Sequence, residues 1–200
     1  MKTRSIVTAA LLFFVLLSTA PLDQALASEG SNDTLPVVSI TALNRDAQKR
    51  TAAKPRVVLA AADAPVFREA DTLEPLATGE IPNYLRALAA MPKTVKPFAD
   101  LVYAALYEGQ VMPELKMAMG LRMAQINASP YVAAHMQRLL RASDRGRKLL
   151  AHMAASEGST APAETLALAY SESLTRNVNG VSDADFQKIR GRLMIRKSSN

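Results

Sequence analysis

Apolar positions spaced by three and four residues form the clearest pattern in the chain, and they begin after Pro82. This spacing gathers apolar side chains on one face of a helix, so it predicts amphipathic helices that pack on a core. The first stripe runs from Leu85 to Leu106 and ends before Gly109, which predicts one long helix. From residue 81 onward the chain is therefore expected to be helical.

Prolines and polar caps divide the remainder of this region into further helices. The expected helices span residues 113–125, 130–142, 144–156 and 162–174, and a last one begins at Ser182. Ser129 and Pro130 together predict the start of one of them, as cap and first helical residue. Ser182 and Asp185 have the spacing of a capping box. The sequence thus predicts an all-α fold of about six helices.

The segment from residue 28 to 80 has a different composition, rich in Ala, Pro, Thr and charged residues. Its prolines interrupt any long helical period, which predicts an irregular, extended or partly disordered N-terminal arm. Within it we expect a short helix over 40–52 and a short strand over 55–59. The helical domain then spans 81–194, and residues 195–200 form a basic tail.

The first 27 residues carry the pattern of a secretory signal peptide. Two basic residues precede an apolar run at positions 6–17. The small residues Ala25 and Ala27 occupy the two positions that a signal peptidase recognises before the cleavage site. The run is shorter than the roughly 20 apolar residues of a transmembrane helix, and no later segment is long and apolar enough. We expect cleavage after Ala27 and a periplasmic or secreted mature protein with no transmembrane segment.

Charge and cysteine content narrow the chemistry. The formal net charge is +6, but the basic residues are scattered, which favours a surface that attracts small acids or anionic lipid over a nucleic-acid interface. The chain has no cysteine, which excludes disulfides, thiolate metal sites and cysteine nucleophiles. Methionines in the helical region suit Cu(I), but methionine is also a common gap-filler in helical cores. We therefore expect no metal and no cofactor.

Three segments of the helical half occur in a fixed order and carry a resemblance. They are Leu115–Asn127, with its LRMAQIN run; Ser129–His135, SPYVAAH; and Leu166–Arg190, with its Leu-Thr and Val-Ser-Asp. Together they resemble the carboxymuconolactone decarboxylase family, which includes alkyl hydroperoxidase D, over residues 81 to about 192. The resemblance implies an alkyl hydroperoxidase D-like helical bundle, assembly into trimers or hexamers, and a family-level activity as peroxidase and antioxidant or as lactone decarboxylase.

The chain departs from the redox pattern of that family at each reactive position. The two cysteine positions fall on Ser129 and Val132, the acidic position on Met117 and the histidine position on Met136. His135 lies one residue early, which rotates its side chain by about 100° on a helix. Thiol peroxidase or disulfide reductase chemistry is therefore chemically absent from this chain.

His135 is the best remaining catalytic candidate, because it lies beside the pocket implied by the resemblance and imidazole has a pKa of about 6.5. One hypothesis is a cofactor-free lyase or isomerase on a small lactone or acid, with His135 as proton donor and Arg122 or Tyr131 as orienting groups. Ser129 is either a nucleophile or a helix cap, and the cap is favoured because His135 lies nearly two turns away.

The alternative hypothesis is a non-catalytic oligomer that binds a small molecule in the same pocket or serves as a scaffold. In that case His135 is a residue of the helix surface or of a subunit contact. Arg122 and Tyr131 then have ordinary packing or surface roles. The surroundings of His135 separate the two hypotheses, because an enzyme needs a second polar group within hydrogen-bond reach of the imidazole.

Overall fold

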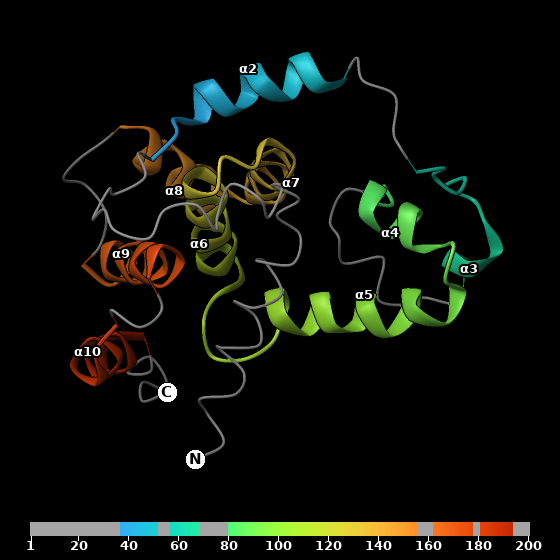
Figure 1. The fold of residues 1–200 in the computed structure, drawn as a ribbon. Coiled ribbons are helices and arrows are strands. Elements are labelled where there is room, and N and C mark those ends of the chain that lie inside the picture. The colour runs from blue at the N-terminus through green and yellow to red at the C-terminus, as the bar shows by residue number, and fades with distance from the viewer. Residues whose placement is uncertain (1–36, 52–56, 69–79, 156–161, 178–180, 194–200) are drawn as a thin grey trace.

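The computed structural model describes residues 37–51, 57–68, 80–155, 162–177 and 181–193. Within these residues the chain forms nine helices and no strand, which confirms the predicted all-α class (Figure 1). The helices are α2 (Ile40–Thr51), α3 (Pro65–Arg68), α4 (Asn83–Leu88), α5 (Pro92–Tyr107), α6 (Pro113–Ile126), α7 (Pro130–Arg141), α8 (Asp144–Ala154), α9 (Pro162–Arg176) and α10 (Asp183–Leu193).

Helix α6 is the centre of the fold. Apolar and small residues surround its axis, so it is buried on most of its circumference. It packs against α7, α8 and α9 and more lightly against α5, while α10 packs against α9 and α3 and α4 pack against α5. In Figure 1, α6 accordingly lies in the middle of the helices.

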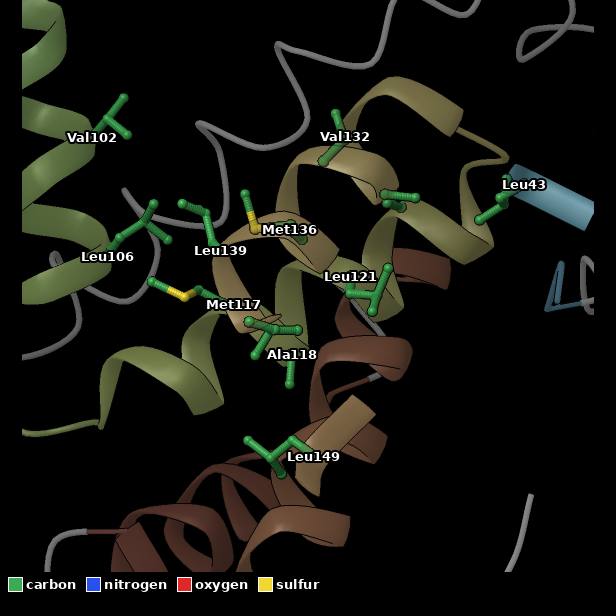
Figure 2. Close-up of a cluster of buried hydrophobic side chains, with 13 residues drawn as sticks. Leu43, Val102, Leu106, Met117, Ala118, Leu121, Val132, Met136, Leu139 and Leu149 are labelled. Atoms are coloured by element: carbon green, nitrogen blue, oxygen red, sulfur yellow. The ribbon is translucent and has the colours of Figure 1, made fainter. Parts of the chain in front are cut away.

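The main hydrophobic core joins five helices, α2, α5, α6, α7 and α8. Figure 2 shows Leu106 of α5 beside Leu139 of α7 and Met117 of α6. Met117 and Met136 are both buried in this core, at 4% and 2% exposure. The flexible thioethers of these two residues therefore fill space between helices. A second, smaller cluster centres on Phe67, Leu85, Val95 and Ala99.

The prediction of one continuous helix from Leu85 to Leu106 is wrong. The chain leaves the helix after Leu88 and starts a new one at Pro92, and Met91 between them adopts φ −122° and ψ 76°. Proline has no N–H to donate and disfavours the helical conformation in the residue before it, so Pro92 ends one helix and begins the next. This break sets α4 apart from α5 and lets α4 approach α7.

Part of the predicted N-terminal arm is packed on the core. Residues 40–51 form α2, which confirms the short helix predicted within the arm. Leu43 is 1% exposed within the main core, and Gln137 of α7 donates its amide to Asn44 at 3.2 Å. The strand predicted over 55–59 is wrong for its described residues 57–59, which have no regular structure.

The later helices begin where the sequence predicts. Helices α6, α7 and α9 start at the predicted prolines, and Ser143 caps α8 by accepting a hydrogen bond from the Gly146 N–H at 3.0 Å. The Ser182–Asp185 capping box is confirmed, because each side chain accepts the other's backbone N–H at 3.2 Å. Among the described helices, none has the length and apolar character to cross a membrane. The leader and the basic tail lie outside the described residues.

Candidate functional site

The turn between α6 and α7 places the residues that the sequence singled out. Ala128 adopts a positive φ of 47°, and Ser129 then stands at the N-cap position of α7 with Pro130 as the first helical residue. The Ser129 side chain accepts no capping hydrogen bond from the helix, so the predicted capping interaction is absent although the predicted position is correct. The Ser129 backbone N–H instead donates to the Ala124 carbonyl at 2.9 Å.

Tyr131, His135 and Arg138 lie on one face of α7, because residues four and seven positions apart are stacked on a helix. This face meets the start of α4. The ring of Tyr84 contacts His135 edge-on, with ring centroids 5.8 Å apart and an angle of 83° between the planes. Glu80, just before α4, pairs with Arg138 at 2.6 Å. We call these five residues, Glu80, Tyr84, Tyr131, His135 and Arg138, the α4–α7 cluster.

Tyr131 joins the two helices of the cluster. Its hydroxyl oxygen accepts a hydrogen bond from the backbone N–H of Tyr84 at 3.3 Å. That N–H belongs to the first turn of α4, where backbone donors have no partner inside the helix. The Tyr131 hydroxyl therefore partly caps α4, and its own O–H is left to donate to another group.

The protonation of His135 follows from its contact with Arg138. The Arg138 Nη2 lies 3.4 Å from the His135 Nδ1, and a guanidinium only donates hydrogen bonds. Nδ1 is therefore the acceptor, and the proton of the neutral imidazole is on Nε2. Among the described residues, the His135 Nε2 is buried and has no hydrogen-bond partner. A buried donor without an acceptor costs about 1–3 kcal/mol, so this N–H would gain by meeting an acceptor atom.

The electrostatics of the cluster keep the imidazole neutral. Burial, together with the positive charge of Arg138, lowers the pKa of His135 from 6.5 to about 4. Burial also raises the pKa of Tyr84 and of Tyr131, so both phenols stay protonated. At neutral pH the cluster thus presents a neutral N–H donor, two phenols and the guanidinium of Arg138, which holds Glu80.

A third helix borders this region through Tyr107 of α5. Tyr107 lies close enough to Tyr84 to contribute to its raised pKa, and its ring stacks on Tyr103 with centroids 5.2 Å apart. Its hydroxyl is a second buried polar atom without a hydrogen-bond partner among the described residues. Phe98, also in α5, contacts the Tyr84 ring with centroids 6.0 Å apart. The polar groups of the cluster therefore lie beside the aromatic rings of α4 and α5.

Arg122 points to another part of the molecule. Its guanidinium pairs with Glu172 of α9 at 2.8 Å, and Arg176 pairs with the other oxygen of the same carboxylate at 2.9 Å. Burial alone would raise the pKa of Glu172, but hydrogen bonds and charge from Arg176 and Arg122 outweigh burial and lower it. The structure brings Tyr131 and His135 together, whereas Arg122 ties α6 to α9.

No cluster of three or more His, Cys, Asp and Glu side chains suited to a metal occurs in the part of the chain that the structure describes. The buried methionines Met117, Met123 and Met136 serve the packing of α6 and α7.

Three members of the cluster were not singled out from the sequence: Glu80, Tyr84 and Arg138. Arg138 has a local signal, since it follows His135 by three residues and Tyr131 by seven. Tyr84 and Glu80 have none, because their partners in α7 lie 47 and 58 residues away. Only the folded structure brings them to the imidazole.

No family model, curated protein or solved structure matches this chain. The resemblance to carboxymuconolactone decarboxylases thus rests on its three sequence segments. The all-helical fold agrees with the helical class that the resemblance implies.

Proposed function

We propose that this protein is an exported member of the carboxymuconolactone decarboxylase-like family whose α4–α7 cluster binds a small carboxylic acid or lactone. The three ordered segments, the all-helical fold and the leader pattern support this assignment. An alkyl hydroperoxidase D-like bundle, assembly into trimers or hexamers and a periplasmic or secreted location belong to the same proposal. Because the chain has no cysteine, the thiol peroxidase activity of the family is not part of it.

The observation that carries the proposal is the Nε2–H of a neutral His135, which has no hydrogen-bond partner among the residues that the structure describes. A carbonyl or carboxylate oxygen of a ligand satisfies this donor. The Arg138 guanidinium, 3.4 Å from the opposite ring nitrogen, attracts a negative group. The two ring nitrogens point to opposite sides of the imidazole, so the two contacts involve different oxygen groups of the ligand. This arrangement suits an acid that also carries a carbonyl, such as a lactone acid or a keto acid.

Binding fits the protonation state of His135 better than proton donation does. With a pKa of about 4, about one imidazole in a thousand is protonated at pH 7. A general acid works best when its pKa is close to the operating pH. The hypothesis that a protonated, cationic His135 donates a proton to the substrate is therefore disfavoured. The same protonation state supports the non-catalytic binding hypothesis.

A second candidate is a cofactor-free lyase or isomerase that uses neutral His135 in another way. A neutral imidazole N–H polarises a carbonyl by hydrogen bonding, without giving up its proton. The unpartnered Nε2–H favours this role over that of proton donor. Turnover of the bound acid, lost in His135→Ala, distinguishes this candidate from binding alone.

Thermal unfolding with a panel of lactones, keto acids and small aromatic acids tests the proposal. A ligand at one hundred times its Kd stabilises the folded state by about 2.7 kcal/mol, which raises the Tm by about 5–10 °C for a chain of this size. The shift should vanish in His135→Ala and persist in the matched variant His152→Ala, which alters the other histidine of the chain. A shift that survives His135→Ala, or no shift with any compound, refutes the proposal.

A further inference from the structure

Arg138 already holds a carboxylate that belongs to the protein itself. Its Nη1 lies 2.6 Å from the Glu80 Oε2, while its Nη2 faces the His135 Nδ1. Glu80 precedes α4 and Arg138 lies in α7, so the contact spans 58 residues of chain. The guanidinium thus links an internal carboxylate to the imidazole that carries the unpartnered N–H.

The geometry of this pair makes Glu80 easy to displace. The Glu80 side chain is 74% exposed, whereas that of Arg138 is 38% exposed and is held against α7 by the imidazole. Exposed ion pairs change an equilibrium constant by less than about fivefold, because water screens the charges and the long side chains lose freedom on pairing. An external carboxylate at Arg138 therefore meets a weak competitor and not a fixed structural bond.

We propose that Glu80 is an internal occupant of the ligand carboxylate position at Arg138, and that an acidic ligand binds by taking its place. This inference rests on the proposed function, since it concerns the same ligand site. It predicts a selectivity that depends on charge: Glu80 lowers the affinity for acids and leaves the affinity for neutral analogues unchanged. Glu80 thus raises the apparent Kd of acids by a small factor and leaves the Kd of neutral analogues unchanged.

The other explanation of the pair is a static tie between the start of α4 and α7. Removing a static tie loosens the site and weakens every ligand, charged or neutral. Removing an internal competitor strengthens acids alone. The two explanations therefore predict opposite signs for the same substitution.

The test measures binding of 5-oxotetrahydrofuran-2-carboxylate, a lactone acid, and of its methyl ester by isothermal titration calorimetry on the mature chain. Glu80→Gln keeps the size and hydrogen-bonding capacity of the side chain but removes its charge. We expect it to bind the acid about two- to fivefold more tightly and the ester with unchanged affinity. The matched control Asp100→Asn removes a carboxylate of the exposed Lys96–Asp100 pair in α5, with the same change in net charge, and should change neither affinity.

Each outcome decides between the two proposals. Wild-type binding that depends on His135 but is unchanged or weakened by Glu80→Gln overturns the role of Glu80 and leaves the proposed function standing. An equal increase in acid affinity in Glu80→Gln and Asp100→Asn also overturns it, because the change in net charge alone then explains the increase. Acid binding that is tighter in Glu80→Gln than in the wild type, with the ester and Asp100→Asn unchanged, supports it. No acid binding in any of these proteins refutes both proposals.

Discussion

The contact between α7 and α8 leaves no room for a side chain at Gly146. A Cβ built on this residue lies 2.7 Å from the Leu140 carbonyl carbon and 2.8 Å from the Leu140 Cα, and closer still to the carbonyl oxygen. These are backbone atoms of the last turn of α7, and Leu140 is itself fully buried in the main core. Because the clashing atoms are backbone and not the end of a flexible side chain, no side-chain rotation relieves the clash. Gly146→Ala must therefore displace the start of α8.

The cost of this displacement follows from the groups involved. Forcing extra volume into a packed contact costs about 1–3 kcal/mol, and three contacts with rigid backbone place this case at the upper end. The shift also weakens the hydrogen bond from the Gly146 N–H to the Ser143 hydroxyl, a helix cap that contributes about 1 kcal/mol. The higher helix propensity of Ala returns about 1 kcal/mol. The net expected loss is about 3 kcal/mol of unfolding free energy.

Gly191 provides the matched control. It lies in α10, is exposed, and a Cβ built on it has no heavy atom within 4 Å. Gly191→Ala therefore gains helix propensity without a clash and should stabilise the protein by about 1 kcal/mol.

Urea and thermal unfolding followed by circular dichroism measure both variants against the wild type. For a chain of this size we expect the Tm to fall by about 6–12 °C in Gly146→Ala and to rise by about 2–4 °C in Gly191→Ala. The reasoning is refuted if Gly146→Ala is as stable as the wild type. It also fails if the two variants change stability in the same direction.

The remaining predictions concern titration and charge. Because the pKa of His135 is lowered in the folded state, the unfolded chain binds more protons between pH 6.5 and about 4, so stability should fall as pH falls through this window; His135→Phe should flatten that slope in urea titrations. Glu172→Gln removes the carboxylate shared by Arg122 and Arg176 and should cost about 1–2 kcal/mol, whereas Asp100→Asn should cost less than about 0.5 kcal/mol in the same assay.

Local signals predicted most helix boundaries correctly. The prolines that open α6, α7 and α9 fix the backbone of the first turn, and the Ser182–Asp185 pair supplies the hydrogen bonds of a helix start. Such signals act within four residues, so the printed sequence contains them in full. The α6–α10 half of the fold was therefore readable from the sequence.

Proline nevertheless had two different effects within the stripe that was predicted as one helix. Pro92 separates α4 from α5, whereas Pro97 lies inside α5 without ending it. Val95 and Ala99, on either side of Pro97, are buried against α3 and α4 in the second cluster. This packing supports a helix that local rules would interrupt, and it is not visible in the sequence pattern.

Long-range packing also determines contacts that the sequence pattern does not show. The composition of residues 28–80 did not indicate that Leu43 is buried in the main core or that α2 packs against α7. In the candidate site, Tyr131 and His135 share a face by helical spacing, which the sequence contains. Tyr84 and Glu80 reach them only because the break at Pro92 brings α4 to α7.

The same long-range packing changes the chemistry expected of His135. An imidazole on a solvated helix has a pKa of about 6.5 and exchanges protons at neutral pH, and the sequence alone gave no reason to expect otherwise. Tyr84 from α4 contacts the ring, and Arg138 places a positive charge beside it. Burial and this charge both lower the pKa of His135 and favour the neutral form. With no thiol in the chain and a neutral imidazole in the cluster, the groups at hand donate hydrogen bonds and do not transfer protons readily. That chemistry favours binding of an acid with a second carbonyl over its chemical conversion. The Glu80→Gln experiment tests the contact with the carboxylate of the proposed ligand, and the His135→Ala experiment tests the contact with its carbonyl.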